Sequence, residues 1–160
     1  MSPTPTPDAT APPTDELLAD LESLVTIESP SSDPVAVTRC LRRVADLLVD
    51  RTGVPAELVE VGGRSHLRWS VGDPRVLLLG HADTVWPHGT LDRLPLRVTG
   101  DRVTGPGVFD MKAGIVMALH ALAGLDDLDG MAVRLTGDEE IGAPTSRPLI
   151  EDTARDVEAV

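Results

Sequence analysis

Residues 76–84, VLLLGHADT, place two polar side chains directly after a short apolar run. Residues 76–79 do not alternate in polarity, which favours a central strand that is covered on both faces. His81 and Asp83 follow, and extended backbone would point both side chains to the same side. Ligand sites in open α/β sheets form outside the carboxyl ends of strands. The stretch predicts a strand that ends in an imidazole and a carboxylate, although taken alone it fits a surface turn with an incidental histidine better.

Helical and extended patterns alternate on both sides of this stretch. Helices are expected from Thr14 to Ser29, from Pro34 to Gly53, over 112–125 and from Pro144 to Asp152; strands are expected over 56–61, 67–71, 94–98, 102–103 and 131–136. This order predicts an α/β layered fold with a mainly parallel or mixed sheet.

Length, charge and cysteine content exclude several classes of protein. The sequence has 160 residues, a formal net charge of −12, 2% aromatic residues and one cysteine. The acidic balance argues against nucleic-acid binding, and no apolar run approaches the ~18–20 residues of a membrane span. A single cysteine excludes an internal disulfide framework. We expect a cytoplasmic domain, preceded by a disordered leader that is rich in proline and threonine over residues 1–14.

A second polar cluster lies within residues 105–114, GPGVFDMKAG. Its glycines allow close backbone approach, and Asp110 lies just before an apolar helical pattern. Asp110 fits a simple helix N-cap as well as a ligand. A phosphate-binding loop is not indicated, because Lys112 is followed by alanine rather than by serine or threonine. The cluster is therefore an open candidate for a metal ligand.

A third cluster, residues 136–142 or TGDEEIG, follows the expected strand 131–136. A solvated acidic turn tolerates three adjacent carboxylates, and taken alone that is the simpler interpretation. Three strand-end clusters in the order His, Asp, Glu-Glu favour a metal site instead. One imidazole with several carboxylates suits zinc, and also cobalt or manganese. A carboxylate that bridges two ions is typical of hydrolytic two-metal sites.

The three clusters together resemble successive motifs of the M20 metallopeptidases. The matching segments are 80–85 (GHADTV), 105–114 and 138–142 (DEEIG), while 86–91 (WPHGTL) and 146–150 (SRPLI) look most like the glutamate-carboxypeptidase branch. The family also includes acetylornithine deacetylase, succinyl-diaminopimelate desuccinylase and aminoacylases. The resemblance implies a layered α/β/α zinc-exopeptidase-like domain with a central mixed, mostly parallel sheet. It also implies hydrolysis of small peptides or N-acyl amino acids.

The resemblance assigns a role to five residues. His81 would bind one zinc ion, and Asp83 would support its imidazole. Asp110 would bridge two zinc ions, and the peptide bond after it is expected to be cis. Glu140 would bind the second zinc, and Glu139 would be the general base. How the adjacent side chains of Glu139 and Glu140 both face the site does not follow from the sequence.

The ligand count falls short of a complete site. Zinc takes about four ligands, and each ion here would have two protein ligands and a water. In the family a carboxylate on the next strand and a distal histidine complete the set, and a lid domain supplies the dimer contact. Residues 15–160 are therefore expected to be the N-terminal portion of a catalytic domain, inactive alone. A non-catalytic acidic interaction module that keeps the scaffold is the alternative.

The other histidines and the cysteine have simpler interpretations. His66 is expected on the surface of a hairpin strand, and His120 as a hydrogen-bonded core residue. His88 lies in a loop where it could line a substrate pocket. Cys40 is placed at the polar side or border of its helix and is expected to be inert.

Overall fold

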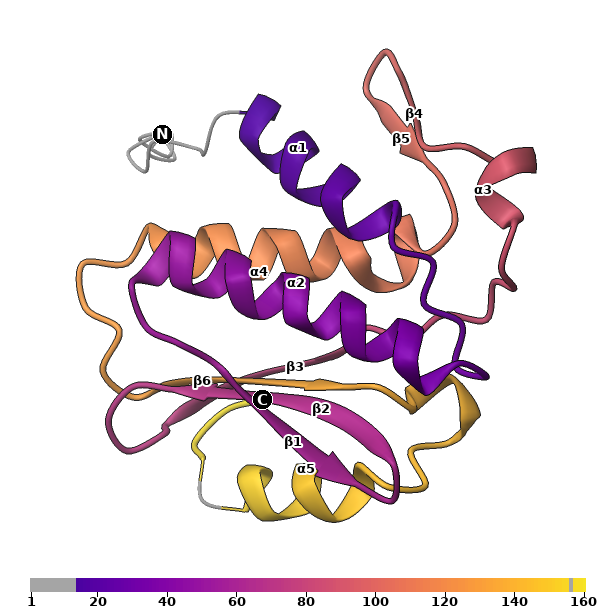
Figure 1. Ribbon diagram of the computed structural model, residues 1–160. Coiled ribbons are helices and arrows are strands. Elements are labelled where there is room, and N and C mark those ends of the chain that lie inside the picture. The colour runs from indigo at the N-terminus through magenta and orange to yellow at the C-terminus, as the bar shows by residue number, and fades with distance from the viewer. Residues whose placement is uncertain (1–13, 156) are drawn as a thin grey trace, which may run out of the picture.

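A computed structural model describes residues 14–155 and 157–160, which form three layers. Figure 1 shows helices α1, α2 and α4 over one face of the main sheet and α5 under the other. The helices are α1 (Thr14–Val25), α2 (Pro34–Thr52), α3 (Thr90–Arg93), α4 (Ala113–Ala123) and α5 (Arg147–Ala154). The strands are β1 (Glu57–Val61), β2 (Arg64–Ser70), β3 (Val76–His81), β4 (Arg97–Thr99), β5 (Arg102–Thr104) and β6 (Met131–Thr136). The expected α/β/α layering is confirmed.

The main sheet has the strand order β1-β2-β6-β3, and β4 and β5 form a separate hairpin. The sheet is mixed, as expected, but it is less parallel than expected. Only β3 and β6 pair in parallel, whereas β2 is antiparallel to both β1 and β6. The reason is that the β1–β2 hairpin adds to the edge of β6 with its second strand reversed. On the other side of β3, Ala159 forms a parallel bridge with Val76.

The parallel pair positions the candidate site. His81, the last residue of β3, lies opposite Thr136, the last residue of β6. The two strands therefore end at the same edge of the sheet, and the segments that follow them leave side by side. Residues 81–83 and 137–140 are brought together in this way, although more than fifty positions separate them in sequence.

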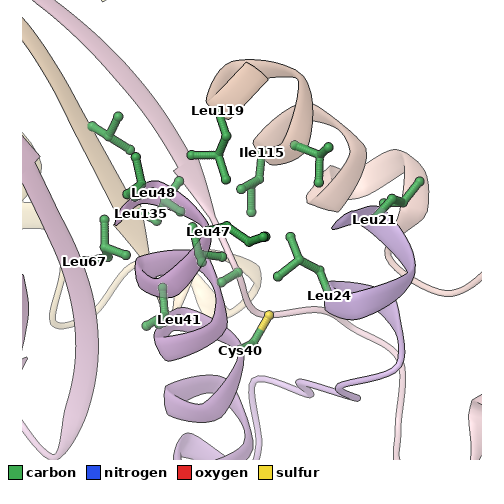
Figure 2. Close-up of a cluster of buried hydrophobic side chains, with 14 of the residues drawn as sticks. Leu21, Leu24, Cys40, Leu41, Leu47, Leu48, Leu67, Ile115, Leu119 and Leu135 are labelled. Atoms are coloured by element: carbon green, nitrogen blue, oxygen red, sulfur yellow. The ribbon is translucent and has the colours of Figure 1, made fainter. Parts of the chain in front are cut away.

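The core lies between the sheet and the three helices above it. Helix α2 starts where Asp33 accepts hydrogen bonds from the backbone N–H groups of Val35 and Ala36, and it ends at Gly53 in the left-handed region (φ 72°). Both ends match the sequence pattern of an acidic N-cap and a C-terminal glycine. Its apolar stripe packs on α1, α4 and β2. Figure 2 shows leucines from these elements packed together, with Cys40 at the edge of the group.

Several expected boundaries shift in the structure. The proposed leader, residues 1–14, lies outside the described residues except for Thr14, which already belongs to α1. The hairpin turn is shorter than expected, because β2 begins at Arg64 directly after two glycines with positive φ. The expected helix over 112–125 begins at Ala113, after an irregular turn (Val108–Lys112). Within the described ranges, no helix combines the length and apolar character needed to cross a membrane.

Candidate metal site

His81 and Asp83 occupy the end of β3 as the strand pattern predicts. The His81 side chain is 5% exposed, and its Nδ1 lies 3.0 Å from the backbone oxygen of Asp83 and 3.5 Å from the Asp83 carboxylate. Because both neighbours are acceptors, Nδ1 carries the hydrogen and donates it. The other ring nitrogen, Nε2, faces Asp110 and Glu139 and can bind a metal ion when the ring is neutral.

Asp110 reaches His81 from the irregular turn before α4. Its Oδ1 lies 2.9 Å from Nε2 of His81. The turn starts at Gly107 (φ 69°), where a Cβ would come within 2.8 Å of the Thr84 side chain, so only glycine fits this approach. The Asp110–Met111 peptide bond is cis, as the family resemblance implies. Asp110 therefore does not cap α4, whose N-cap position is Lys112, and it stays a candidate ligand.

Lys112, the last residue of the turn Val108–Lys112, anchors that turn in the core. It is 2% exposed, and its Nζ donates to the backbone oxygens of Leu24 and Ile27 at 3.1 and 2.8 Å. These carbonyls belong to the last turn of α1 and to the segment just after it, where the last helix oxygens need partners from outside the helix. Lys112 therefore ties the Asp110 turn to α1. In the sequence, Lys112 only speaks against a phosphate loop, and no local pattern indicates this anchoring role.

Glu139 and Glu140 lie in a single 3₁₀ turn (Glu139–Ile141) after β6. Their backbone N–H groups donate to Oδ1 and Oδ2 of the Asp83 carboxylate, each at 3.2 Å. The tight turn places Oε2 of Glu139 3.9 Å from Nε2 of His81, while Glu140 joins His81 and Asp110. The buried Asp83 carboxylate therefore holds the turn from which the side chains of both glutamates approach His81.

The side chain of Asp138, the first of the three adjacent acidic residues, points away from His81 and toward the loop before α5. It is fully buried, and its carboxylate accepts hydrogen bonds from the backbone N–H and the hydroxyl of both Thr145 and Ser146, at 2.5–3.3 Å. These bonds close the loop that contains both glutamates. The Asp138 carboxylate is thereby kept apart from its two acidic neighbours, whereas Glu139 and Glu140 share one environment and the charge of Glu139 helps to raise the pKa of Glu140.

His66 supports the same loop, so the expectation of a surface histidine is wrong. The side chain is fully buried, its Nδ1 accepts from the backbone N–H of Gly137 at 3.2 Å, and its Nε2 lies 3.0 Å from the Thr145 hydroxyl. Burial lowers the pKa of His66, which favours the neutral ring. The loop between β6 and α5 covers this strand position, and no local sequence pattern reports that cover.

Ser31 is a further contact that the sequence did not indicate. Its hydroxyl donates to Oδ2 of Asp83 at 2.6 Å from the turn between α1 and α2. Burial alone would raise the pKa of Asp83, but the hydrogen bonds from His81 and Ser31 outweigh burial and lower it. Asp83 is therefore a carboxylate held in its charged form by donors on three sides.

Ligand atoms of His81, Asp110 and Glu140 lie within 4.8 Å of one another, the only such group among the described residues. Burial disfavours a charged His81 ring, but hydrogen bonds to Asp83 and Asp110 outweigh it and raise the pKa of His81 to about 9. Burial, together with Asp110 and other nearby carboxylates, raises the pKa of Glu140. Neighbouring carboxylates contribute to both shifts, and a bound cation would neutralise part of their charge. The donor set and its spacing fit a divalent metal ion.

The remaining candidates lie elsewhere in the fold. His120 is a hydrogen-bonded core residue as expected, 2.8 Å from Asp20. His88 is half exposed, and its Nε2 lies 3.0 Å from the carboxylate of Asp33, so it links its loop to the start of α2. Cys40 is fully buried rather than at a polar border, because its helix faces both the sheet and α1; burial raises the pKa of its thiol, consistent with an inert residue.

The three layers and the acidic cluster at the sheet edge define an α/β domain with a candidate divalent-metal centre. Residues 77–160 match the model of peptidase family M20/M25/M40, and the chain belongs to this family. It is 39% identical over 89 residues to carboxypeptidase G2 from Pseudomonas sp. (strain RS-16), a match that covers 52% of this chain and 21% of that protein. It is 35% identical over 136 residues to N-acetyl-L-citrulline deacetylase from Xanthomonas campestris, covering 82% and 37%.

The fold comparison agrees with this assignment. The structure of an M20 family metallo-carboxypeptidase from Sulfolobus solfataricus superposes with a TM-score of 0.75 at 20% identity, and the match covers 88% of this chain and 35% of that one. The likeness at this identity establishes the fold. The chain spans between 21% and 37% of the length of the two curated relatives named above.

Proposed function

We propose that this chain carries part of the active site of a zinc-dependent hydrolase that cleaves amide bonds in small peptides or N-acyl amino acids. The observation that carries the proposal is the group formed by His81, Asp110 and Glu140 at the carboxyl ends of β3 and β6. The names of the relatives, a carboxypeptidase and an N-acyl amino acid deacetylase, support this class of substrate. Cobalt or manganese would fit the same ligands.

The proposed site would hold two metal ions, with His81 as a ligand of one ion through Nε2, Glu140 as a ligand of the other and Asp110 as a ligand of both. When bound, such ions polarise a carbonyl oxygen and lower the pKa of a water molecule. The residues divide the remaining work. The Asp83 backbone oxygen and carboxylate keep hydrogen on Nδ1 of His81, so that Nε2 faces the site as a neutral ligand.

Glu139 is the proposed general base. Its side chain is 55% exposed and ends 3.9 Å from Nε2 of His81, close to the cluster but not enclosed by it. A carboxylate in this place takes a proton from the attacking water and returns it to the leaving amine. Its backbone bond to Asp83 fixes the position of the turn from which it acts.

The described residues give each proposed ion two protein ligands, whereas zinc in proteins takes about four. We therefore expect the 160-residue chain alone to bind zinc weakly and to hydrolyse no amide at a measurable rate. Substrate selection, the dimer contact and the remaining ligands would come from other parts of a complete enzyme. Hydrolysis of N-acyl amino acids or dipeptides by the purified chain would contradict this expectation.

A zinc titration separates this proposal from a non-catalytic acidic module. In the hydrolase scaffold, zinc binds to the wild-type chain and binding falls at least tenfold in Asp110→Ala. The control is Asp101→Ala in the β4–β5 turn, which removes the same charge from an exposed position away from the cluster. Equal and negligible zinc binding by wild type and Asp110→Ala would favour the module.

A further inference from the structure

Arg134 is a buried cation on the face of the main sheet that α5 covers, opposite the face covered by α1, α2 and α4. It is 5% exposed and lies on β6 between Val133 and Leu135, which face the core. Because side chains alternate along a strand, Arg134 points to the other face, where its Nη2 donates to the Thr153 hydroxyl of α5 at 2.6 Å. Its Nε and Nη1 have no hydrogen-bond partner among the described residues. A buried guanidinium with unpaired donors is costly and calls for an explanation.

The neighbouring strand makes the charge balance worse. Arg68 lies directly opposite Arg134 in the antiparallel β2–β6 pair, and like charges at opposed positions destabilise a sheet. Glu57 on β1 pairs with Arg68 at the exposed end of this row. The nearby Asp152 carboxylate forms an ion pair with Arg155 at 3.2 Å. Arg134 is thus left without a carboxylate partner in the described part of a chain whose net charge is −12.

A cavity of about 520 Å³ opens beside this arginine. It lies between the sheet and α5. Its lining includes the donors Arg68, Ser70, Arg134 and Thr153 and the carboxylates Glu57 and Asp152, each of which already pairs with another arginine. Serine and threonine hydroxyls and an arginine are the donors that proteins use for oxyanions. The cavity is on the far side of the sheet from α1, α2 and α4, and no residue of the metal cluster lines it.

We propose that this cavity binds an oxyanion, the carboxylate or phosphate group of a small molecule, with Arg134 as its main cationic partner and Thr153 and Ser70 as flanking donors. Both unpaired nitrogens are covered in the structure, so the guanidinium turns toward the cavity when the anion enters. The bound anion then supplies the negative charge that balances Arg134, because Glu57 balances only Arg68 in the row Glu57–Arg68–Arg134.

Inorganic phosphate is the probe. Isothermal titration calorimetry at constant ionic strength, with the chain freed of metal by a chelator, measures its binding to wild type and to Arg134→Met. Methionine keeps an unbranched chain of similar length and removes the charge. The matched control is Arg97→Met, which removes an exposed arginine from the β4–β5 hairpin.

We expect saturable phosphate binding by wild type and by Arg97→Met, and binding at least tenfold weaker in Arg134→Met. Thermal unfolding supplies a second readout that also shows whether the variant folds: phosphate raises the Tm of wild type and leaves that of Arg134→Met unchanged. Acetate in place of phosphate distinguishes the two kinds of oxyanion. A carboxylate site would bind acetate as tightly as phosphate, whereas a phosphate site would bind acetate more weakly. Absent phosphate binding by wild type, or equal binding by Arg134→Met, would overturn the proposal.

Discussion

The carboxylate of Asp83 accepts a hydrogen bond from the backbone N–H of Glu140 across a sequence separation of 57 residues. The same carboxylate accepts from Glu139 and from the Ser31 hydroxyl, and it lies beside Nδ1 of His81. Asp83 therefore joins the two strand ends that the parallel β3–β6 pair brings together. Its part is to orient the turn that contains both glutamates as well as the imidazole.

Asp83→Asn should lower the free energy of unfolding by about 1–3 kcal/mol. An amide presents one oxygen, so its NH₂ group would face either the Glu139 N–H or the donors on the other side, and a buried donor loses its acceptor. Urea denaturation measures the change, with the exposed Asp73→Asn as the control. A loss no larger than that of the control would show that the backbone bonds of Asp83 contribute little.

Glu139→Gln and Glu140→Gln should separate the base from the ligand. Because Glu140 belongs to the metal group and Glu139 does not, zinc affinity should fall at least tenfold in Glu140→Gln and stay near wild type in Glu139→Gln. In a complete enzyme with this site, loss of the general base should lower kcat by about 10²–10⁴-fold. Competition against a zinc-binding dye measures the first effect. An equal loss of zinc affinity in both variants would show that Glu139 also binds zinc, which contradicts the proposed division of roles.

Lys112, the only lysine in the sequence, should resist amine-modifying reagents in the folded chain. It is 2% exposed and bound to two carbonyl oxygens, so modification requires local opening of the α1 end. Peptide mass spectrometry should find acetylation of Lys112 at least about 100-fold slower than in urea. The N-terminal amine is the internal control. Equal rates would show that Lys112 does not anchor the Asp110 turn.

Glu28→Gln should destabilise the fold in a pH-dependent way. Backbone N–H groups of Leu91 and Gly89 bind the Glu28 carboxylate at 3.0 and 2.7 Å and lower its pKa. A lowered pKa gives stability that is present above the ordinary value of 4.5 and is lost as pH falls through the folded value. The Tm difference between wild type and Glu28→Gln should therefore be present at pH 6 and shrink below pH 4.5. A difference that does not change with pH would contradict this origin.

Local patterns were sufficient where neighbours in sequence determine the structure. The Asp33 cap, the Gly53 stop and the strand Met131–Thr136 all appear as predicted, and the three polar clusters meet at one edge of the sheet. Features that depend on distant contacts were not predictable. His66 is buried by a loop that follows β6, and Asp138 turns away because Thr145 and Ser146 bind it. The reversed direction of β2 likewise depends on pairing with a strand more than sixty residues away.

The central claim is that His81 is the histidine ligand of a metal group with Asp110 and Glu140. The chain has four histidines, and NMR of their ring nitrogens during a zinc titration tests the claim residue by residue. The account predicts that Nε2 of His81 alone shifts on binding, that the resonances of His66, His88 and His120 stay in place, and that Asp110→Asn weakens the response at least tenfold. A response at His88, which lies between Glu28 and Asp33, with no change at His81 would contradict the account.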